Sequence, residues 1–415
     1  MKTGHPLNRF IDFGILWMLG ITILRGLQKP SDWAEAHWLI NYEFGFLKRA
    51  LPGTLLHPFI TQQTAETVIT IISTTLLGIF FITLAWMCIS HLRTFDYKLE
   101  TILTTLAFLT SPYIVMSAHL NGFYDNLLIL LSIAAIMLVR QGKHAVAAGV
   151  VTVGILVHEN IFLVGLPSVL FAMVYYQVQK DGQFNLKIIL RQALPFLLPV
   201  LAFIALFLFQ SYYLNGELLR NQLAVHLSQF EFIERNRDKT VPDAFTISFL
   251  DYTEHQSQFF LARIFNKNYL TRILPTLILT LLLAGNIIPK NKKKGILLAL
   301  LAVASLIPLS LHAIARDTSR IWTFPLIAAL LGLWTISRSM DKIKFTNKFQ
   351  ISYIIACTAV IIHNIFLQTP LMGGLSERYS NDMRLWLYFP AFALVYIVHF
   401  IAQRNDSKKY ENLPS

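Results

Sequence analysis

The sequence predicts an all-α polytopic membrane protein with about 12 membrane segments, some of them short or re-entrant. Of the 415 residues, 55% are hydrophobic and 14% are charged, whereas about 25% of the residues in soluble domains are charged. The apolar residues gather in runs close to the roughly 20 residues that a helix needs to cross a bilayer. These observations exclude a protein made of soluble domains, and they make the lipid bilayer its first partner.

Twelve apolar runs are the candidate membrane segments. They cover residues 10–27, 67–90, 101–118, 127–139, 145–157, 161–176, 190–210, 272–289, 295–313, 321–337, 349–368 and 385–402. Residues 145–176 could also form one long helix, but that helix would put the basic stretches at 140–144 and 177–187 on opposite sides of the membrane. We therefore expect a hairpin with its tip at 158–160.

The distribution of basic residues predicts the orientation. The connections at 119–126 and 158–160 contain no Lys or Arg, whereas the connections on the other side, with the two ends of the chain, contain more than half of the 35. Cytoplasmic connections carry an excess of Lys and Arg, so both termini are predicted to be cytoplasmic. The net charge of +12 comes from short dispersed clusters, which argues against a nucleic-acid partner.

The chain is expected to form a single integral-membrane domain over residues 1–405, followed by a cytoplasmic tail at 406–415. Two extracytoplasmic pieces stand out, namely a first loop at 28–66 with interfacial helices and a long aromatic-rich loop at 211–271. A loop of that length without a soluble fold of its own is expected to pack on the membrane surface or over a cavity. Cys88 and Cys357 lie far apart in apolar segments, so neither a disulfide nor a thiolate metal site is expected.

The first loop contains the candidate catalytic residues, Asp32 and Glu35. Their spacing is that of a capping box, which would explain both carboxylates without catalysis. A half-desolvated carboxylate at the membrane interface can also have a raised pKa and act as a general base. Which of the two is the base is left open. His37, Lys48 and Arg49 follow as candidate substrate-binding residues, although snorkelling is the commoner role of such cations.

Two further outer turns carry ionisable residues next to apolar segments. His119, Tyr124 and Asp125 lie in one turn, and His158 and Glu159 lie in the other. Polar groups are costly near hydrocarbon, so they are candidates for substrate binding. Their histidines and carboxylates could also hold a divalent metal such as Mg or Mn, but no spacing fixes their mutual distance, and the cofactor remains unknown.

Arginines in the last outer turns indicate an anionic ligand. Arg316, Asp317 and Arg320 lie in one short outer connection, and Arg378 lies in the next. Arginine on this side runs against the usual bias, and its planar fork binds two phosphate oxygens at once. We therefore expect these arginines to hold a phosphate group, with Asp317 as an ion-pair partner.

This arrangement, together with the loop SDWAEAHWLINYEFGFLKRALPG, resembles the GT-C superfamily of integral-membrane glycosyltransferases. The resemblance implies a polyprenyl-phosphate-linked sugar donor and acidic catalytic residues in the first outer loop, at the place of Asp32 and Glu35. Two residues separate Asp32 from Glu35 here, whereas adjacent acidic pairs are common in the family.

The resulting hypothesis is a hexosyl- or pentosyltransferase of cell-envelope polysaccharide or glycoconjugate assembly. It would transfer the sugar with inversion to a glycan, lipid or protein acceptor, at the periplasmic or outer side of a bacterial inner (plasma) membrane. One alternative is an O-antigen- or capsule-type polymerase that uses lipid-pyrophosphate-linked repeats. Another is a multi-pass transporter or lipid flippase, for which internal repeats and charges near mid-membrane would be expected.

Overall fold

The computed structural model describes residues 6–234, 236, 238–288, 293–339 and 350–411. In these ranges every regular element is a helix, and nine helices are long and apolar enough to cross a bilayer. The chain is thus an all-α, multi-pass membrane protein, as the composition predicts. The count of twelve segments and the side that faces the cytoplasm stay predictions.

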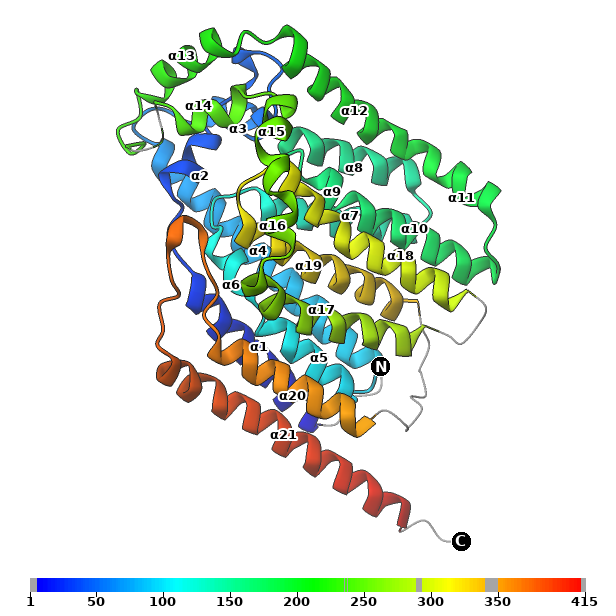
Figure 1. Cartoon of the computed structure of the whole chain (residues 1–415). Coiled ribbons are helices and arrows are strands. Elements are labelled where there is room, and N and C mark those ends of the chain that lie inside the picture. Colours follow the sequence, from blue (N-terminus) through cyan, green and yellow to red (C-terminus); the bar gives the residue numbers. More distant parts are fainter. Residues whose placement is uncertain (1–5, 235, 237, 289–292, 340–349, 412–415) are drawn as a thin grey trace.

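The long helices form one bundle (Figure 1). In chain order they are α1 (Pro6–Gly26), α4 (Ala65–Thr94), α5 (Leu99–Leu109), α6 (Pro112–His119), α7 (Asp125–Arg140), α8 (His144–Val157), α10 (Leu166–Asp181), α11 (Leu186–Ala193), η3 (Leu194–Phe196), α12 (Leu197–Leu208), α17 (Lys267–Ile287), α18 (Lys294–Leu306), α19 (Thr318–Ser337), α20 (Gln350–Phe366) and α21 (Asn381–Glu411).

Short helices join the long ones, and most of them cover one end of the bundle. They are α2 (Asp32–His37), η1 (Tyr42–Phe44), α3 (Ala50–Leu56), η2 (His57–Phe59), α9 (Ile161–Val164), η4 (Phe209–Tyr213, a π-helix), α13 (Gly216–Leu227), α14 (Thr240–Thr246), α15 (Phe249–Gln256), η5 (Ser257–Phe259), α16 (Phe260–Ile264), η6 (Ile307–Ala313) and η8 (Met372–Gly374). We call those between α1 and α4 and between α12 and α17 the cap layer.

The predicted hairpin at 145–176 is present. The backbone of His158 is extended, with φ −166° and ψ 125°, so α8 ends at Val157. The chain then turns through α9, and α8 and α10 both pack against α7 and run back from the turn (Figure 1). The tip at 158–160 therefore lies at the cap-layer end of the bundle.

Burial separates central from peripheral helices. In the most apolar 18-residue windows, α5 with α6 is 100% buried and α19 is 94% buried, whereas the stretch Leu186–Tyr213 and α21 are only 17% and 28% buried. The peripheral helices expose large apolar side chains such as Leu201, Phe389 and Trp386. Such surfaces suit contact with lipid, because lipid tails solvate apolar side chains.

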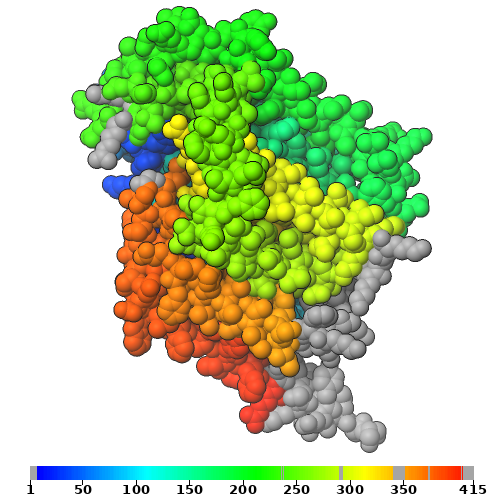
Figure 2. All heavy atoms as spheres, viewed as in Figure 1, coloured from blue at the N-terminus to red at the C-terminus, as the bar shows by residue number. Residues whose placement is uncertain are grey.

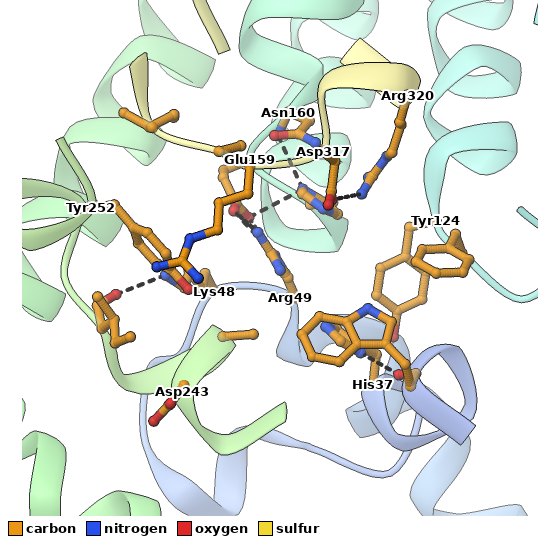
Figure 3. Close-up of a pocket in the computed structure, with 18 of the residues that line it drawn as sticks. His37, Lys48, Arg49, Tyr124, Glu159, Asn160, Asp243, Tyr252, Asp317 and Arg320 are labelled. Atoms are coloured by element: carbon orange, nitrogen blue, oxygen red, sulfur yellow. Dashed lines mark hydrogen bonds and ion pairs between the residues drawn. The ribbon is translucent and has the colours of Figure 1, made fainter. Parts of the chain in front are cut away.

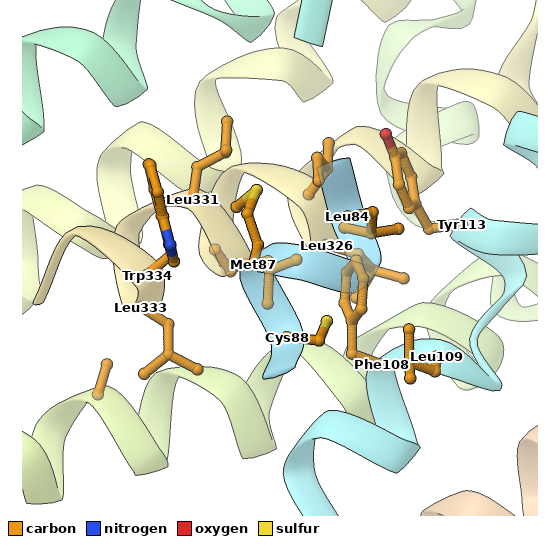
Figure 4. Packing of buried hydrophobic residues seen from close by; sticks show 14 of the residues in the cluster. Leu84, Met87, Cys88, Phe108, Leu109, Tyr113, Leu326, Leu331, Leu333 and Trp334 are labelled. Atoms are coloured by element: carbon orange, nitrogen blue, oxygen red, sulfur yellow. The ribbon is translucent and has the colours of Figure 1, made fainter. Parts of the chain in front are cut away.

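Close packing holds the centre together, because lipid gives helices little hydrophobic reason to associate. Side chains of α4, α5, α6 and α19 interlock there, among them Met87, Phe108 and Trp334 (Figure 4). A Cβ at Gly332 of α19 would lie 2.0 Å from Cδ1 of Leu301 of α18. Any larger residue at this position would require the Leu301 side chain to move.

A buried ion-pair cluster fastens the last helix to the first. Arg25, near the end of α1, donates to both carboxylate oxygens of Glu377 at 2.8 and 2.9 Å, and both side chains are fully buried. Arg384 of α21 lies 3.4 Å from the same carboxylate, and the hydroxyl of Tyr388 accepts from Arg25 at 3.3 Å. The connection before α21 is therefore fixed to the end of α1.

Polar contacts with backbone carbonyls tie the parts of the cap layer to one another. His226 of α13 donates to the carbonyl of Leu39 at 3.0 Å, and Gln210 of η4 donates to that of Phe245 in α14 at 3.0 Å. Figure 2 shows the green surface of this part of the chain over this end of the molecule. The cap layer thus covers this end of the bundle.

Replacing Glu377 by Ala should strongly destabilise the fold, because it leaves the Arg25 guanidinium buried without its carboxylate. We expect a loss of about 3–5 kcal/mol in the free energy of unfolding, measured by thermal or denaturant unfolding in detergent micelles. Glu254 is exposed on α15, so Glu254→Ala is the matched control and should leave stability unchanged. Equal stability of the two variants would contradict the structural role of the cluster.

Candidate functional site

A cavity of about 380 Å³ lies between the cap layer and the bundle (Figure 3). Its walls come from the first loop, the turn before α7, the hairpin tip, residues 240–252 of the cap layer and residues 314–320. The site residues predicted from the sequence that line it are His37, Lys48, Arg49, Tyr124, His158, Glu159, Arg316, Asp317 and Arg320. Segments far apart in the sequence thus converge on one site.

The predicted catalytic residues, Asp32 and Glu35, do not line the cavity. Helix α2 presents Trp33, Ala34 and His37 to it, and positions 32 and 35 lie on the opposite side of a 3.6-residue helix. Asp32 accepts from the side chain of Asn236 at 2.7 Å. A catalytic role of either carboxylate stays a prediction that this geometry does not favour.

The start of α2 explains where these two carboxylates point. Ser31 is the N-cap of α2, and its hydroxyl accepts from the amide of Ala34 at 3.3 Å. The predicted capping box, which has Asp32 as its N-cap, is therefore wrong by one residue. Glu35 is buried against α4, where its carboxylate accepts from Thr70 at 3.2 Å. Burial raises the pKa of Glu35 to about 7.

The other predicted residues outside the lining have structural partners. The backbone carbonyl of His119 accepts from Gln28 at 3.0 Å. Asp125 is paired with Arg320 directly behind the cavity wall. Arg378 is exposed, on the connection that the Arg25–Glu377 pair draws away from the cavity. Of the five outer turns expected to carry the site, four meet at the cavity and the fifth does not.

The Arg49–Glu159 ion pair joins the first loop to the hairpin tip. Nε of Arg49 lies 3.1 Å from each carboxylate oxygen of Glu159, and Nη2 also bonds to Oε1. Burial disfavours the charged form of both side chains, but the attraction between the two charges outweighs this effect. The pKa of Arg49 is therefore held above its ordinary value, and that of Glu159 well below. The pair is a fixed part of the cavity wall.

The backbone at Arg49 supports the importance of this contact. Its φ of 65° places it in the left-handed region, which is rarely adopted by residues other than glycine and costs about 1–3 kcal/mol. Such strain persists where surrounding contacts impose it. Here it turns the chain into α3 and aims the guanidinium at Glu159.

Arg320 lies between two carboxylates. Its Nε and Nη2 atoms donate to Oδ1 of Asp125 at 3.0 and 2.9 Å, and Nη1 lies 3.4 Å from Oδ2 of Asp317. The ring of Phe123 packs against the guanidinium, with its centroid at 5.6 Å. Arg320 thus fixes the start of α19 against the turn before α7 and holds Asp317 at the cavity.

Lys48 lies in the cavity wall without a carboxylate partner in the part of the chain that the structure describes. Its Nζ donates to the carbonyl of Ile247 at 2.9 Å and lies 4.9 and 5.2 Å from the ring centroids of Phe249 and Tyr252. Burial lowers the pKa of Lys48 to about 7, with the charge of Glu159 opposing this shift and that of Arg49 contributing to it. Its charge near neutral pH therefore depends on what enters the cavity.

Arg316 is the second cation of the lining without an ion pair among the described residues. Its side chain is exposed, and within that part of the chain neither a carboxylate nor a hydrogen-bond acceptor holds it. The positive charges of Arg316 and Arg49 both act on Tyr252, which is also the ring next to Lys48. Lys48 and Arg316 together make this side of the cavity a place for an anion.

The sequence analysis missed Trp33, Asp243 and Tyr252, which also line the cavity. Asp243 of α14 is held by Arg220 of α13, whose Nε donates to Oδ1 at 2.6 Å. Tyr252 belongs to the long loop at 211–271, which is expected to pack on the membrane surface or over a cavity. The spacing of short helices in a long loop gives no signal of which face turns inward.

The candidate metal ligands are not gathered at one point. Among the residues that the structure describes, no group of three or more His, Cys, Asp or Glu side chains is placed to hold a metal ion. Asp125 and Glu159 are instead neutralised by arginines. These two carboxylates are therefore held in ion pairs.

Comparison of the chain with protein-family models, with curated proteins and with solved structures finds no match. The chemistry of the site must therefore be argued from its own geometry. The cavity offers two cations with capacity for an anion, a carboxylate at its edge and a wall of aromatic and uncharged polar side chains.

Lys48 should be modified by amine reagents at a much lower pH than ordinary lysines, because its lowered pKa leaves much of it uncharged near pH 7. We expect half-maximal reductive methylation at about pH 7, followed by mass spectrometry of the folded protein in detergent. Lys267 is exposed at the start of α17 and serves as the internal control. A Lys48 that reacts only at the pH at which Lys267 reacts would contradict the assignment.

Proposed function

We propose that the protein is a membrane glycosyltransferase that moves a sugar from a polyprenyl-phosphate carrier to a glycan, lipid or protein acceptor. The observation that carries the proposal is the pair Lys48 and Arg316, two cations without carboxylate partners among the described residues in one cavity at the end of a membrane bundle. A lipid-linked donor can bring its phosphate to that level without leaving the bilayer.

The charge balance favours a single phosphate over a pyrophosphate. The charged side chains that line the cavity, together with their ion-pair partners, are the cations Lys48, Arg49, Arg220, Arg316 and Arg320 and the carboxylates Asp125, Glu159, Asp243 and Asp317. With Lys48 protonated, one positive charge is in excess. A sugar–phosphate–lipid diester carries one negative charge, whereas a pyrophosphate diester carries two. This difference supports a transferase over a polymerase of pyrophosphate-linked repeats.

Asp317 is the carboxylate of the cavity best suited to act as general base. Its closest contact is the 3.4 Å approach to Arg320, and 41% of its side chain is exposed. Glu159 is unsuited because Arg49 binds both of its oxygens, and Oδ1 of Asp243 is bound by Arg220. Asp32, which the sequence favours, is the second candidate, although it lies on the side of α2 that faces away from the cavity.

The proposed reaction needs no other reactant than donor and acceptor. The base takes the proton of an acceptor hydroxyl, and the hydroxyl oxygen forms the new bond to the anomeric carbon. The bond between that carbon and the phosphate oxygen breaks, and the electron pair leaves with the phosphate. Lys48 and Arg316 stabilise the charge that develops on the leaving phosphate, and attack from the opposite face inverts the anomeric centre.

Transfer of labelled sugar from polyprenyl phosphate in liposomes containing the full chain tests this proposal. Asp317→Asn should lower kcat by about 10²–10⁴-fold, the range expected for loss of a general base. Arg316→Gln should mainly weaken donor binding. Glu254→Gln, at an exposed position of α15, is the control.

The same assay separates the two candidate bases. Loss of transfer in Asp32→Asn with full transfer in Asp317→Asn would assign the base to Asp32. Full transfer in both single variants and in their double variant would sink the proposed site.

A further inference from the structure

The side of the cavity away from Lys48 is built from uncharged polar and aromatic side chains. Figure 3 shows Lys48 and Tyr252 on one side and His37 and Tyr124 on the other, with Arg49 between them. A ligand that places a phosphate beside Lys48 must place the group attached to that phosphate near His37 and Tyr124. This side of the cavity therefore faces the sugar of the donor, which is the part that differs between donors.

His37 offers a hydrogen-bond acceptor. Its Nδ1 lies 2.7 Å from the carbonyl of Trp33, and because a carbonyl can only accept, Nδ1 carries the hydrogen. The other ring nitrogen, Nε2, then has a free electron pair. Burial and the nearby charge of Arg49 together lower the pKa of His37 to about 3. The ring is thus neutral at any physiological pH.

Tyr124 offers a hydroxyl group without a partner. Its side chain is 3% exposed, and its oxygen is buried and makes no hydrogen bond within the described ranges. The rings of Trp38, His37 and His158 surround it, with centroids 4.9, 6.4 and 6.5 Å away. An unsatisfied buried hydroxyl costs about 1–3 kcal/mol, so a polar group of a ligand recovers that free energy.

Trp33 adds an aromatic wall. Its ring lies 4.8 Å from that of His37, and both residues line the cavity from consecutive turns of α2. An aromatic face suits the C–H face of a sugar ring, while the acceptor of His37 and the hydroxyl of Tyr124 suit the hydroxyls at its edge. The three side chains have complementary tasks.

We infer that Trp33, His37 and Tyr124 form a subsite that selects an uncharged, hydroxylated sugar ring; the inference rests on the proposed function. A carboxylate on the ring would face the electron pair of His37, and the one excess positive charge of the site is already matched by the phosphate. An ammonium group on the ring would face Arg49 and Arg320, whose charges also act on His37. Neutral hexoses and pentoses avoid both penalties.

Direct binding of three lipids to the full chain in nanodiscs tests the inference. The probes are polyprenyl phosphate, polyprenyl-phosphate-linked glucose as a neutral sugar and polyprenyl-phosphate-linked glucuronate as an acidic one. We expect the glucose lipid to bind about tenfold tighter than bare polyprenyl phosphate and the glucuronate lipid to bind no tighter than the bare lipid. Tyr124→Phe and His37→Leu should each remove most of that preference and leave binding of the bare lipid unchanged.

Matched variants separate subsite from phosphate site. His37→Gln keeps an acceptor and should retain more of the preference than His37→Leu, whereas Arg316→Gln should weaken all three lipids alike. Equal binding of glucose lipid and bare lipid, tighter binding of the glucuronate lipid, or a preference that survives both Tyr124→Phe and His37→Leu would overturn the subsite alone. Binding of none of the three lipids, or binding indifferent to Arg316→Gln and Lys48→Met, would overturn the proposed function itself.

Discussion

The Arg49–Glu159 ion pair is the contact on which the cavity depends. Glu159 follows an apolar helix and precedes another, and a carboxylate in that place is costly unless a cation meets it. Arg49 meets it from a loop 110 residues earlier, at the cost of a left-handed backbone. Once this pair is formed, Lys48 is fixed beside it, the hairpin tip is fixed against the first loop, and the space between them becomes the cavity.

The same rule applies to two buried arginines, Arg25 and Arg320. Arg25 has Glu377, and Arg320 has Asp125, and each pair joins two segments that are remote in sequence. Buried ion pairs of this kind fix the relative positions of two segments but add little net stability, because the cost of desolvating both charges cancels much of their attraction. Among the lining residues described, Lys48 and Arg316 are the cations without an ion pair. An unpaired cation at a cavity indicates a functional site more strongly than a paired one.

Hydrophobic pattern was sufficient to predict an all-helical membrane protein and the hairpin at 145–176, because length and apolarity dominate insertion into a bilayer. The cost of placing a charge near hydrocarbon pointed to Glu159, and the bias against arginine on the outer side pointed to Arg320; both side chains line the cavity.

The sequence does not predict which face of each helix turns toward the cavity. Ser31 caps α2 one residue before Asp32, and contacts with Thr70 and Asn236 turn Asp32 and Glu35 away from the cavity. Arg378 failed for a similar reason, since the partner that positions its connection, Arg25, lies at the other end of the chain. Long-range contacts of this kind leave no local pattern.

The pairing of remote segments has a consequence for biosynthesis. Membrane helices enter the bilayer in the order of synthesis, so Arg25 arrives 352 residues before Glu377. Until then its position near the end of α1 allows the long side chain to reach the headgroup region. Arg25 thus gains its carboxylate partner only after nearly the whole chain has been made, when the connection before α21 has been synthesised.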